Sequence, residues 1–202
     1  MLNRIATVIS YIFNPLIMPT LGVFVLFSTN SLMVYQPPEI KRAVYLIVFL
    51  STFVLPFSFI PFFLYNKLIS GIMMKDRRER IIPLIVTSVM YIFAAFLIYR
   101  IPVAIFLKKF IIATAINVFL VLLVSLRWKI SVHMVGVGGL VGLVLALSFY
   151  DRSNIFYFFI ASIILSGLVG SSRLQLKAHE PPQVYAGFLQ GLIIVSSILL
   201  FA

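Results

Sequence analysis

Long apolar stretches without a single Asp, Glu, Lys or Arg recur along the whole chain. Most are close to the roughly 20 residues that an α-helix needs to cross the hydrocarbon core of a bilayer. Apolar residues make up 62% of the 202 residues and charged residues only 10%, against roughly 25% in a soluble domain. Membrane β-strands would be shorter and would alternate polar with apolar residues. The sequence therefore predicts an all-α, polytopic membrane bundle.

The charge-free stretches predict six to seven spans, with seven preferred, in a single transmembrane domain over residues 1–202. The expected spans cover residues 5–27, 43–66, 81–99, 110–126, 130–150, 153–171 and 183–202. Asn14, Pro15 and Pro19 predict a kink in the first of them. Because the connections are short, we expect neighbouring spans to pack as antiparallel pairs.

Glycines in two consecutive spans predict a close helix contact. The fifth span contains Gly136, Gly138, Gly139 and Gly142, and the sixth ends with Gly167 and Gly170. Small residues allow two helix backbones to approach each other in a membrane. We therefore expect the tightest contact of the bundle between the fifth and sixth spans.

The net charge of +11 comes from basic residues in short loops between the apolar stretches. This distribution is typical of topology signals and of contacts with anionic lipids or phosphate, and it argues against nucleic acid as a partner. The chain has no cysteine, which excludes disulfides and thiolate catalysis, and it has only two histidines and five acidic residues. We expect no metal and no other cofactor, and the oligomeric state stays open.

Three polar clusters are expected on one face of the membrane. They are the loop 67–80, the segment from Arg127 to His133 and the segment from Arg173 to His179. Each is separated from the next by two predicted crossings, so all three share a face with the N-terminus. Pro181 and Pro182 end the helical pattern after Arg173, so His179 is expected in a turn.

The direction of insertion is open. Ten of the 16 basic residues fall on the cluster face, which favours that face as cytoplasmic. Several of these ten are candidates for holding phosphate, however, and setting five of them aside leaves the two faces nearly equal. We expect a multi-pass protein of a bacterial inner (cytoplasmic) membrane, with the face of the site unresolved.

The shared face favours phosphate chemistry. Phosphoryl transfer without a metal needs a nucleophile, an acid for the leaving oxygen and fixed cations for the equatorial oxygens. Histidine can fill the first two roles near neutral pH, and arginine pairs with phosphate bidentately. The chain offers one histidine for each role, His133 and His179, with Arg173, Lys75 and Arg80 as cations.

The spacing of these residues resembles a known family. Ser172-Arg173, five residues, His179, three residues and Gln183 are similar to the third signature of the type 2 phosphatidic acid phosphatases, Ser-Arg, five residues, His, three residues, Asp. This superfamily includes the vanadium haloperoxidases. Residues 130–133, Ile-Ser-Val-His, resemble its second signature, Pro-Ser-Gly-His. The segment from Lys75 to Pro83 resembles the first, Lys, six residues, Arg-Pro.

The resemblance implies a phosphatase-like core at about residues 67–190 and a metal-independent reaction. His179 would be the nucleophile and form a phosphohistidine, and His133 would protonate the leaving alcohol. The phosphate oxygens would be held by Lys75, Arg173 and the backbone around Ser131 and Ser172. The substrates implied are lipid phosphates and diphosphates: phosphatidate, phosphatidylglycerol phosphate and polyprenyl diphosphate.

The chain departs from the family pattern at several positions. Gln183 stands where the family has Asp, and it can orient the imidazole of His179 without stabilising a positive charge on it. Ile82 replaces the Arg before Pro83, so only Arg80 could substitute for it. Val132 replaces a Gly that would let backbone approach phosphate. The stretch between the first and second signatures is also expected to cross the membrane twice, which is unusual for the family.

Two alternatives from other classes remain. One is a catalytically inactive protein that binds lipid phosphate through Arg173 and Lys75. The other is a lipid transporter or flippase, although the predicted spans contain no Asp, Glu, Lys or Arg, whereas transporters of charged solutes usually carry one at mid-membrane.

Overall fold

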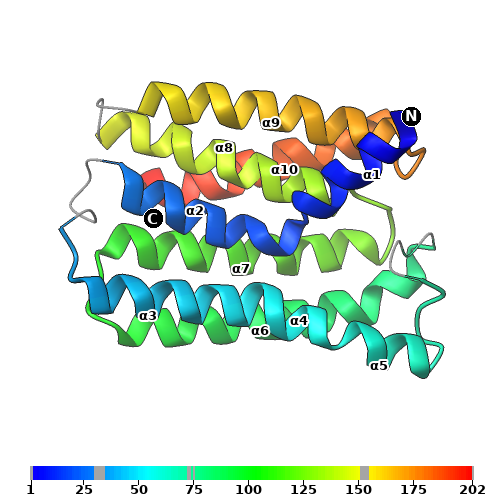
Figure 1. Cartoon of the computed structure of the whole chain (residues 1–202), viewed down its shortest axis with the longest axis horizontal. Helices are drawn as coiled ribbons and strands as arrows, with labels where there is room; N and C mark the ends of the chain where they lie inside the picture. The colour runs from blue at the N-terminus through cyan, green and yellow to red at the C-terminus, as the bar shows by residue number, and fades with distance from the viewer. Residues whose placement is uncertain (1, 30–34, 72–73, 75, 151–154, 202) are drawn as a thin grey trace.

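The computed structural model describes residues 2–29, 35–71, 74, 76–150 and 155–201, and every regular element in these ranges is helical (Figure 1). Seven helices or helix series are long and apolar enough to cross a membrane. The chain is therefore a multi-pass integral membrane protein with a seven-span helical bundle, as the sequence predicts. Four spans are single helices: α7 (Ile105–Ser125), α8 (Val132–Tyr150), α9 (Ile155–Gln175) and α10 (Pro181–Phe201).

The first three spans are composite. The first joins α1 (Leu2–Ile12), the 3₁₀ turn η1 (Pro15–Ile17) and α2 (Met18–Ser28). The second joins α3 (Pro38–Phe49), the π-helical turn η2 (Leu50–Val54), α4 (Leu55–Ser58) and α5 (Ile60–Tyr65). The third adds the 3₁₀ turn η3 (Arg78–Arg80) to the start of α6 (Ile81–Arg100). The expected kink in the first span is thus confirmed as a complete break.

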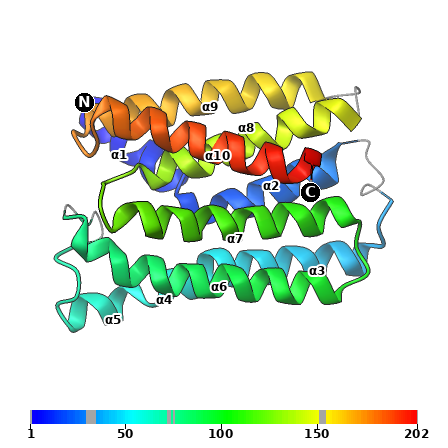
Figure 2. The same cartoon turned by 180° about the vertical axis from the view of Figure 1, so that it is seen from behind.

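Helix α8 is the centre of the bundle. In the most apolar window of α8, 67% of the residues are buried, compared with at most 39% in any other span. Figure 1 shows α8 between α9 and α2 with α10 behind it, and Figure 2 shows α10 in front of it from the opposite side. Residues at the start of α8 are therefore shielded from lipid by several other spans.

The glycines of α8 pack mainly against α10. The prediction that the fifth span makes its tightest contact with the sixth was therefore wrong, because the partner is the seventh span. A Cβ atom added at Gly138 would collide with the carbonyl of Phe188, and one at Gly142 would lie 2.6 Å from the Leu192 oxygen. In return, Gly191 of α10 lies against the Val135 carbonyl. Gly167 of α9 would meet nothing within 4 Å. The sequence gives the small residues but not the direction in which each faces.

Helix α7 begins about one turn earlier than predicted, at Ile105. Its first turns include Lys108, whose ammonium lies 5.1 Å from the ring centroid of Tyr99. A long lysine side chain can reach the membrane surface while its backbone lies deeper. Taking the span as the stretch without charged residues therefore placed its start too late.

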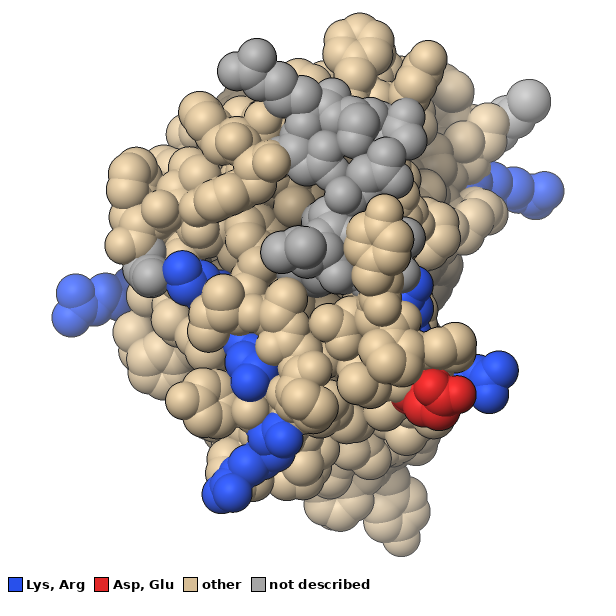
Figure 3. Space-filling model, turned by 90° about the vertical axis from the view of Figure 1, so that its left-hand side faces the viewer, with Lys and Arg blue, Asp and Glu red and all other residues tan. Residues whose placement is uncertain are grey.

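Both histidines lie at the end of the bundle that carries the N-terminus. Figure 1 shows α5, the connection from α7 to α8 and the connection from α9 to α10 at this same end, as the crossing argument predicts. We call it the histidine end. Figure 3 shows the opposite end, where Lys and Arg side chains are scattered over the face.

Candidate active site

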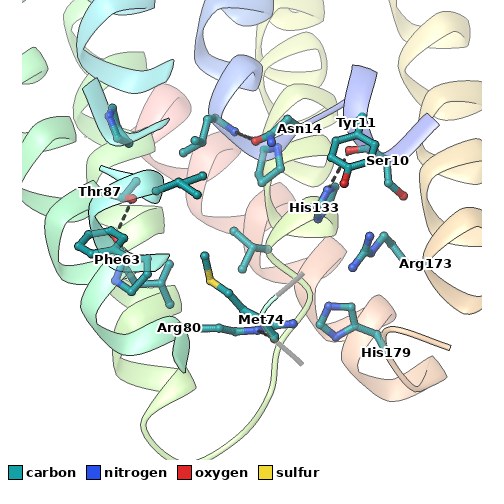
Figure 4. Close-up of a pocket in the computed structure, with 17 residues that line it drawn as sticks. Ser10, Tyr11, Asn14, Phe63, Met74, Arg80, Thr87, His133, Arg173 and His179 are labelled. Atoms are coloured by element: carbon teal, nitrogen blue, oxygen red, sulfur yellow. Dashed lines mark hydrogen bonds between the residues drawn. The ribbon is translucent and has the colours of Figure 1, made fainter. Parts of the chain in front are cut away.

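A cavity of about 190 Å³ opens at the histidine end between five of the spans. Its polar lining includes Arg80 before α6, His133 on α8, Arg173 on α9 and His179 between α9 and α10. Figure 4 shows these four side chains around a shared space. Much of the remaining lining is apolar and comes from the first three spans. We call it the outer cavity.

His179 lies in a short, well-defined turn, as predicted. Helix α9 ends with the Lys177 N–H donating to the Leu174 carbonyl and the Ala178 N–H donating to the Arg173 carbonyl. This pair of bonds is the Schellman motif, whose left-handed position is here Lys177 at φ 49°. Helix α10 starts two residues after His179, at Pro181. Two helix ends therefore fix the backbone on either side of His179.

Gln183 determines which nitrogen of His179 carries the proton. The Gln183 Oε1 atom accepts the Glu180 backbone N–H at 3.3 Å and lies 3.0 Å from His179 Nδ1. A backbone N–H can only donate, so the side-chain atom at this point is oxygen, and Nδ1 must donate to it. The Nε2 atom of the neutral ring therefore keeps its lone pair, which is the form a nucleophile needs.

The charge state of His179 fits this tautomer. The side chain is buried, with 7% of its surface exposed. Burial, followed by the nearby Arg80 guanidinium, lowers the pKa of His179 from 6.5 to about 3, although the Gln183 hydrogen bond acts in the opposite direction. The imidazole is consequently neutral at physiological pH.

His133 is held by the first span. Its Nε2 atom lies 3.2 Å from the backbone oxygen of Ser10, and because a carbonyl only accepts, Nε2 carries a proton. The Ser10 carbonyl is in the last turn of α1. Asn14 is extended there (φ −60°, ψ 136°) and Pro15, which follows it, has no N–H with which to continue the helix. The helix break thus provides an acceptor for His133, and Nδ1 is left for chemistry.

Two buried guanidinium groups complete the polar part of the cavity. Arg80 is 8% exposed and Arg173 is 5% exposed. Arg80 donates to the carbonyls of Met74 at 3.1 Å and Ile130 at 3.5 Å. The buried Nε of Arg173 has no hydrogen-bond partner among the described residues. The described lining also contains no Asp or Glu. Buried cations without a carboxylate favour an anionic ligand.

The other predicted site residues lie outside the cavity lining or outside the described residues. Ser172 donates its hydroxyl to the Leu168 carbonyl at 2.7 Å within α9. The backbone N–H of Ser131 donates to the Gln183 carbonyl at 3.2 Å, and its buried hydroxyl has no described partner. Neither serine lines the cavity. Lys75 lies outside the described residues. Arg80 does line the cavity, whereas Ile82 is 40% exposed on the outer surface.

Sequence reasoning missed the contribution of the first span. The Asn14-Pro15 pair predicted a kink, but nothing in the sequence indicates that the freed Ser10 carbonyl faces His133. It also left Lys129 without a role. Burial, followed by Arg80 and Arg173, lowers the pKa of Lys129, which lies beside His179 on the outer side of the site.

No protein-family model, curated protein or solved structure matches this chain.

Proposed function

We propose that this protein is a metal-independent phosphatase of the phosphatidic acid phosphatase type, acting on a lipid phosphate or polyprenyl diphosphate in a bacterial inner membrane. One observation carries the proposal: two histidines and two buried arginines from four separate segments line one cavity. Their order in the chain agrees with the resemblance of the sequence to that family.

The first chemical step uses the free lone pair of His179. Nε2 attacks the phosphorus and forms an N–P bond, while the P–O bond to the lipid alcohol breaks on the opposite side. His133 takes the proton of the substrate phosphate on Nδ1 and donates it to the leaving oxygen, since its Nε2–H is bonded to Ser10. Arg80 and Arg173 stabilise the charge on the equatorial oxygens.

The second step returns the enzyme to its starting state. Water attacks the phosphohistidine from the side that the alcohol has left, and His133 accepts a proton from that water. The N–P bond breaks, inorganic phosphate leaves with the proton that His133 has accepted, and His179 is again neutral, with its Nδ1–H donated in a hydrogen bond to Gln183. Gln183 offers only a dipole to the positive charge that develops on His179, so this enzyme is expected to be slower than one with a carboxylate there.

The test is phosphate release from phosphatidate, phosphatidylglycerol phosphate and polyprenyl diphosphates, in detergent with excess EDTA. We expect release by the wild type, loss of release in His179→Ala and wild-type release in Lys177→Ala, a change in the same turn. Full activity of His179→Ala would rule out the nucleophile. Equal loss in both variants would mean that the turn has been disturbed instead.

A second candidate is a catalytically inactive protein that binds lipid phosphate. The observation that favours it is Gln183, which places no negative charge beside His179. It predicts binding of lipid phosphate that is lost in Arg173→Ala, with no phosphate release by the folded wild type. A lipid flippase would instead move labelled lipid between leaflets of a vesicle without releasing phosphate.

A further inference from the structure

A second, smaller cavity of about 90 Å³ adjoins the outer cavity on the side that faces the bundle interior. The two share five lining residues, namely Pro15, Leu16, Leu84, Thr87 and Val132. None of the four polar residues of the proposed phosphate site lines the smaller cavity. We call it the inner cavity. The five shared residues are therefore a common wall of the two cavities, which lie next to each other.

The inner cavity presents a mostly apolar surface, with Tyr91, Asn117 and two threonines as its polar lining residues. Most of its lining is aliphatic or aromatic. The hydroxyls of Thr87 and Thr114 donate back to carbonyls of their own helices, each at 2.7 Å. The Asn117 side-chain oxygen accepts from Gln190 at 3.2 Å. Cavities with such walls stay dry and bind hydrocarbons.

The fold itself keeps the inner cavity open. Gly139 lines it without a side chain, and an added Cβ would lie 3.3 Å from Val195. The buried Phe110 also lines it, so core residues bound the cavity on the bundle side. By comparison with a cavity of about 150 Å³ that holds benzene, its volume accommodates roughly four carbon atoms of one chain.

We infer that the inner cavity is a hydrocarbon subsite for a single chain attached directly to the phosphate oxygen. The inference rests on the proposed function, and it narrows the substrate class to alkyl or prenyl phosphates and diphosphates. In-line attack by His179 directs the leaving oxygen and its chain away from His179, toward the bundle interior. A glycerol ester would bring ester oxygens against walls that are mostly aliphatic or aromatic, and the desolvation of these oxygens disfavours it.

The test measures binding of n-alkyl phosphonates, which cannot be hydrolysed, by calorimetry in detergent with chains of two to twelve carbons. Each buried methylene contributes about 0.8 kcal/mol, which is about fourfold in affinity. We expect the affinity of the wild type to rise on the order of 100-fold in total as the chain is lengthened by the carbons that the inner cavity accommodates. Val118→Phe, which fills the cavity, loses most of this gain while its affinity for inorganic phosphate stays unchanged.

Two variants keep the test interpretable. Ile116→Phe makes the related enlargement on the exposed side of the same helix and keeps the wild-type dependence on chain length. Gly139→Ala removes less of the cavity volume, about the space of one methylene, and should lower the affinity for the longer chains about fourfold. A Val118→Phe protein that binds every phosphonate as the wild type does overturns the subsite, and so do equal affinities for all chain lengths. Chain-length-dependent binding without turnover of the matching phosphates instead overturns the proposed function and leaves the subsite standing.

Discussion

Replacing Gln183 with Glu changes the charge beside His179 with almost no change in shape. The new carboxylate oxygen would take the place of Oε1, 3.0 Å from His179 Nδ1. It would still accept the Glu180 N–H near the start of α10, where a negative charge is favourable. The substitution therefore isolates the effect of charge on the imidazole.

The size of the effect follows from the distance. Two unit charges about 3 Å apart interact by about 5 kcal/mol at an effective dielectric constant of 20, and the desolvation of the carboxylate offsets part of this. We expect a net gain of about 1–3 kcal/mol for the charged ring. This raises the pKa of His179 from about 3 by about one to two units. If the same charge develops in the rate-limiting step, phosphate release rises about tenfold to 100-fold.

The assay combines both quantities. The chain contains only two histidines, so NMR titration of labelled imidazoles gives the pKa of His179 once His133→Ala has assigned the signals. Rates of phosphate release are measured on the same protein. Gln175→Glu is the matched control, because it adds the same charge on an exposed residue at the histidine end. If Gln183→Glu changed neither the pKa nor the rate more than Gln175→Glu does, our assignment of the Nδ1–Gln183 hydrogen bond would be wrong.

Three further predictions use the local geometry. Changing Asn14 and Pro15 together to Ala lets α1 continue and withdraws the Ser10 carbonyl from His133. Formation of the phosphoenzyme from an alkyl phosphate should slow at least tenfold in single-turnover experiments, whereas its formation from p-nitrophenyl phosphate, whose leaving group needs no acid, should change little; an equal fall for both would contradict this role. Lys177→Gly removes a side chain from a left-handed position (φ 49°) and should raise stability by about 1 kcal/mol in thermal unfolding, with unchanged activity. The depressed pKa of His179 is expected to make stability depend on pH: its contribution is complete above pH 6.5 and is lost as the pH falls toward 3, by about 1.4 kcal/mol per pH unit. His179→Ala should flatten this slope in melting curves, and a wild-type slope in that variant would refute the buried neutral ring.

Much of the fold could be predicted because the bilayer constrains the sequence strongly. Charge-free stretches gave the seven spans, and counting crossings brought His133 and His179 to one end. The limits came from local physics that sequence patterns do not encode. Gly138 packs against α10 because of the direction in which it faces, and Lys108 lies inside α7 because a lysine side chain can extend to the surface.

The candidate site could be predicted only in part, for a similar reason. Spacing identified His133, Arg173 and His179, because these residues lie at the start of α8, at the end of α9 and in the short turn that follows α9. The contact between Ser10 and His133 joins residues 123 positions apart, and no pattern in one sequence reports such a contact. The cavity walls likewise come from five spans, so their shape follows from packing of the whole bundle.

The central claim is that His179 becomes phosphorylated, and trapping the phosphoenzyme tests it most directly. Protein is mixed with p-nitrophenyl phosphate carrying radiolabelled phosphate, quenched with alkali, digested and sequenced. In His133→Ala the first step needs no acid with this leaving group, but the second lacks its base, so label should accumulate on His179 as an acid-labile phosphoramidate. His179→Ala should carry no label. Label on another residue, or rapid phosphate release without any labelled protein in either variant, would contradict the account.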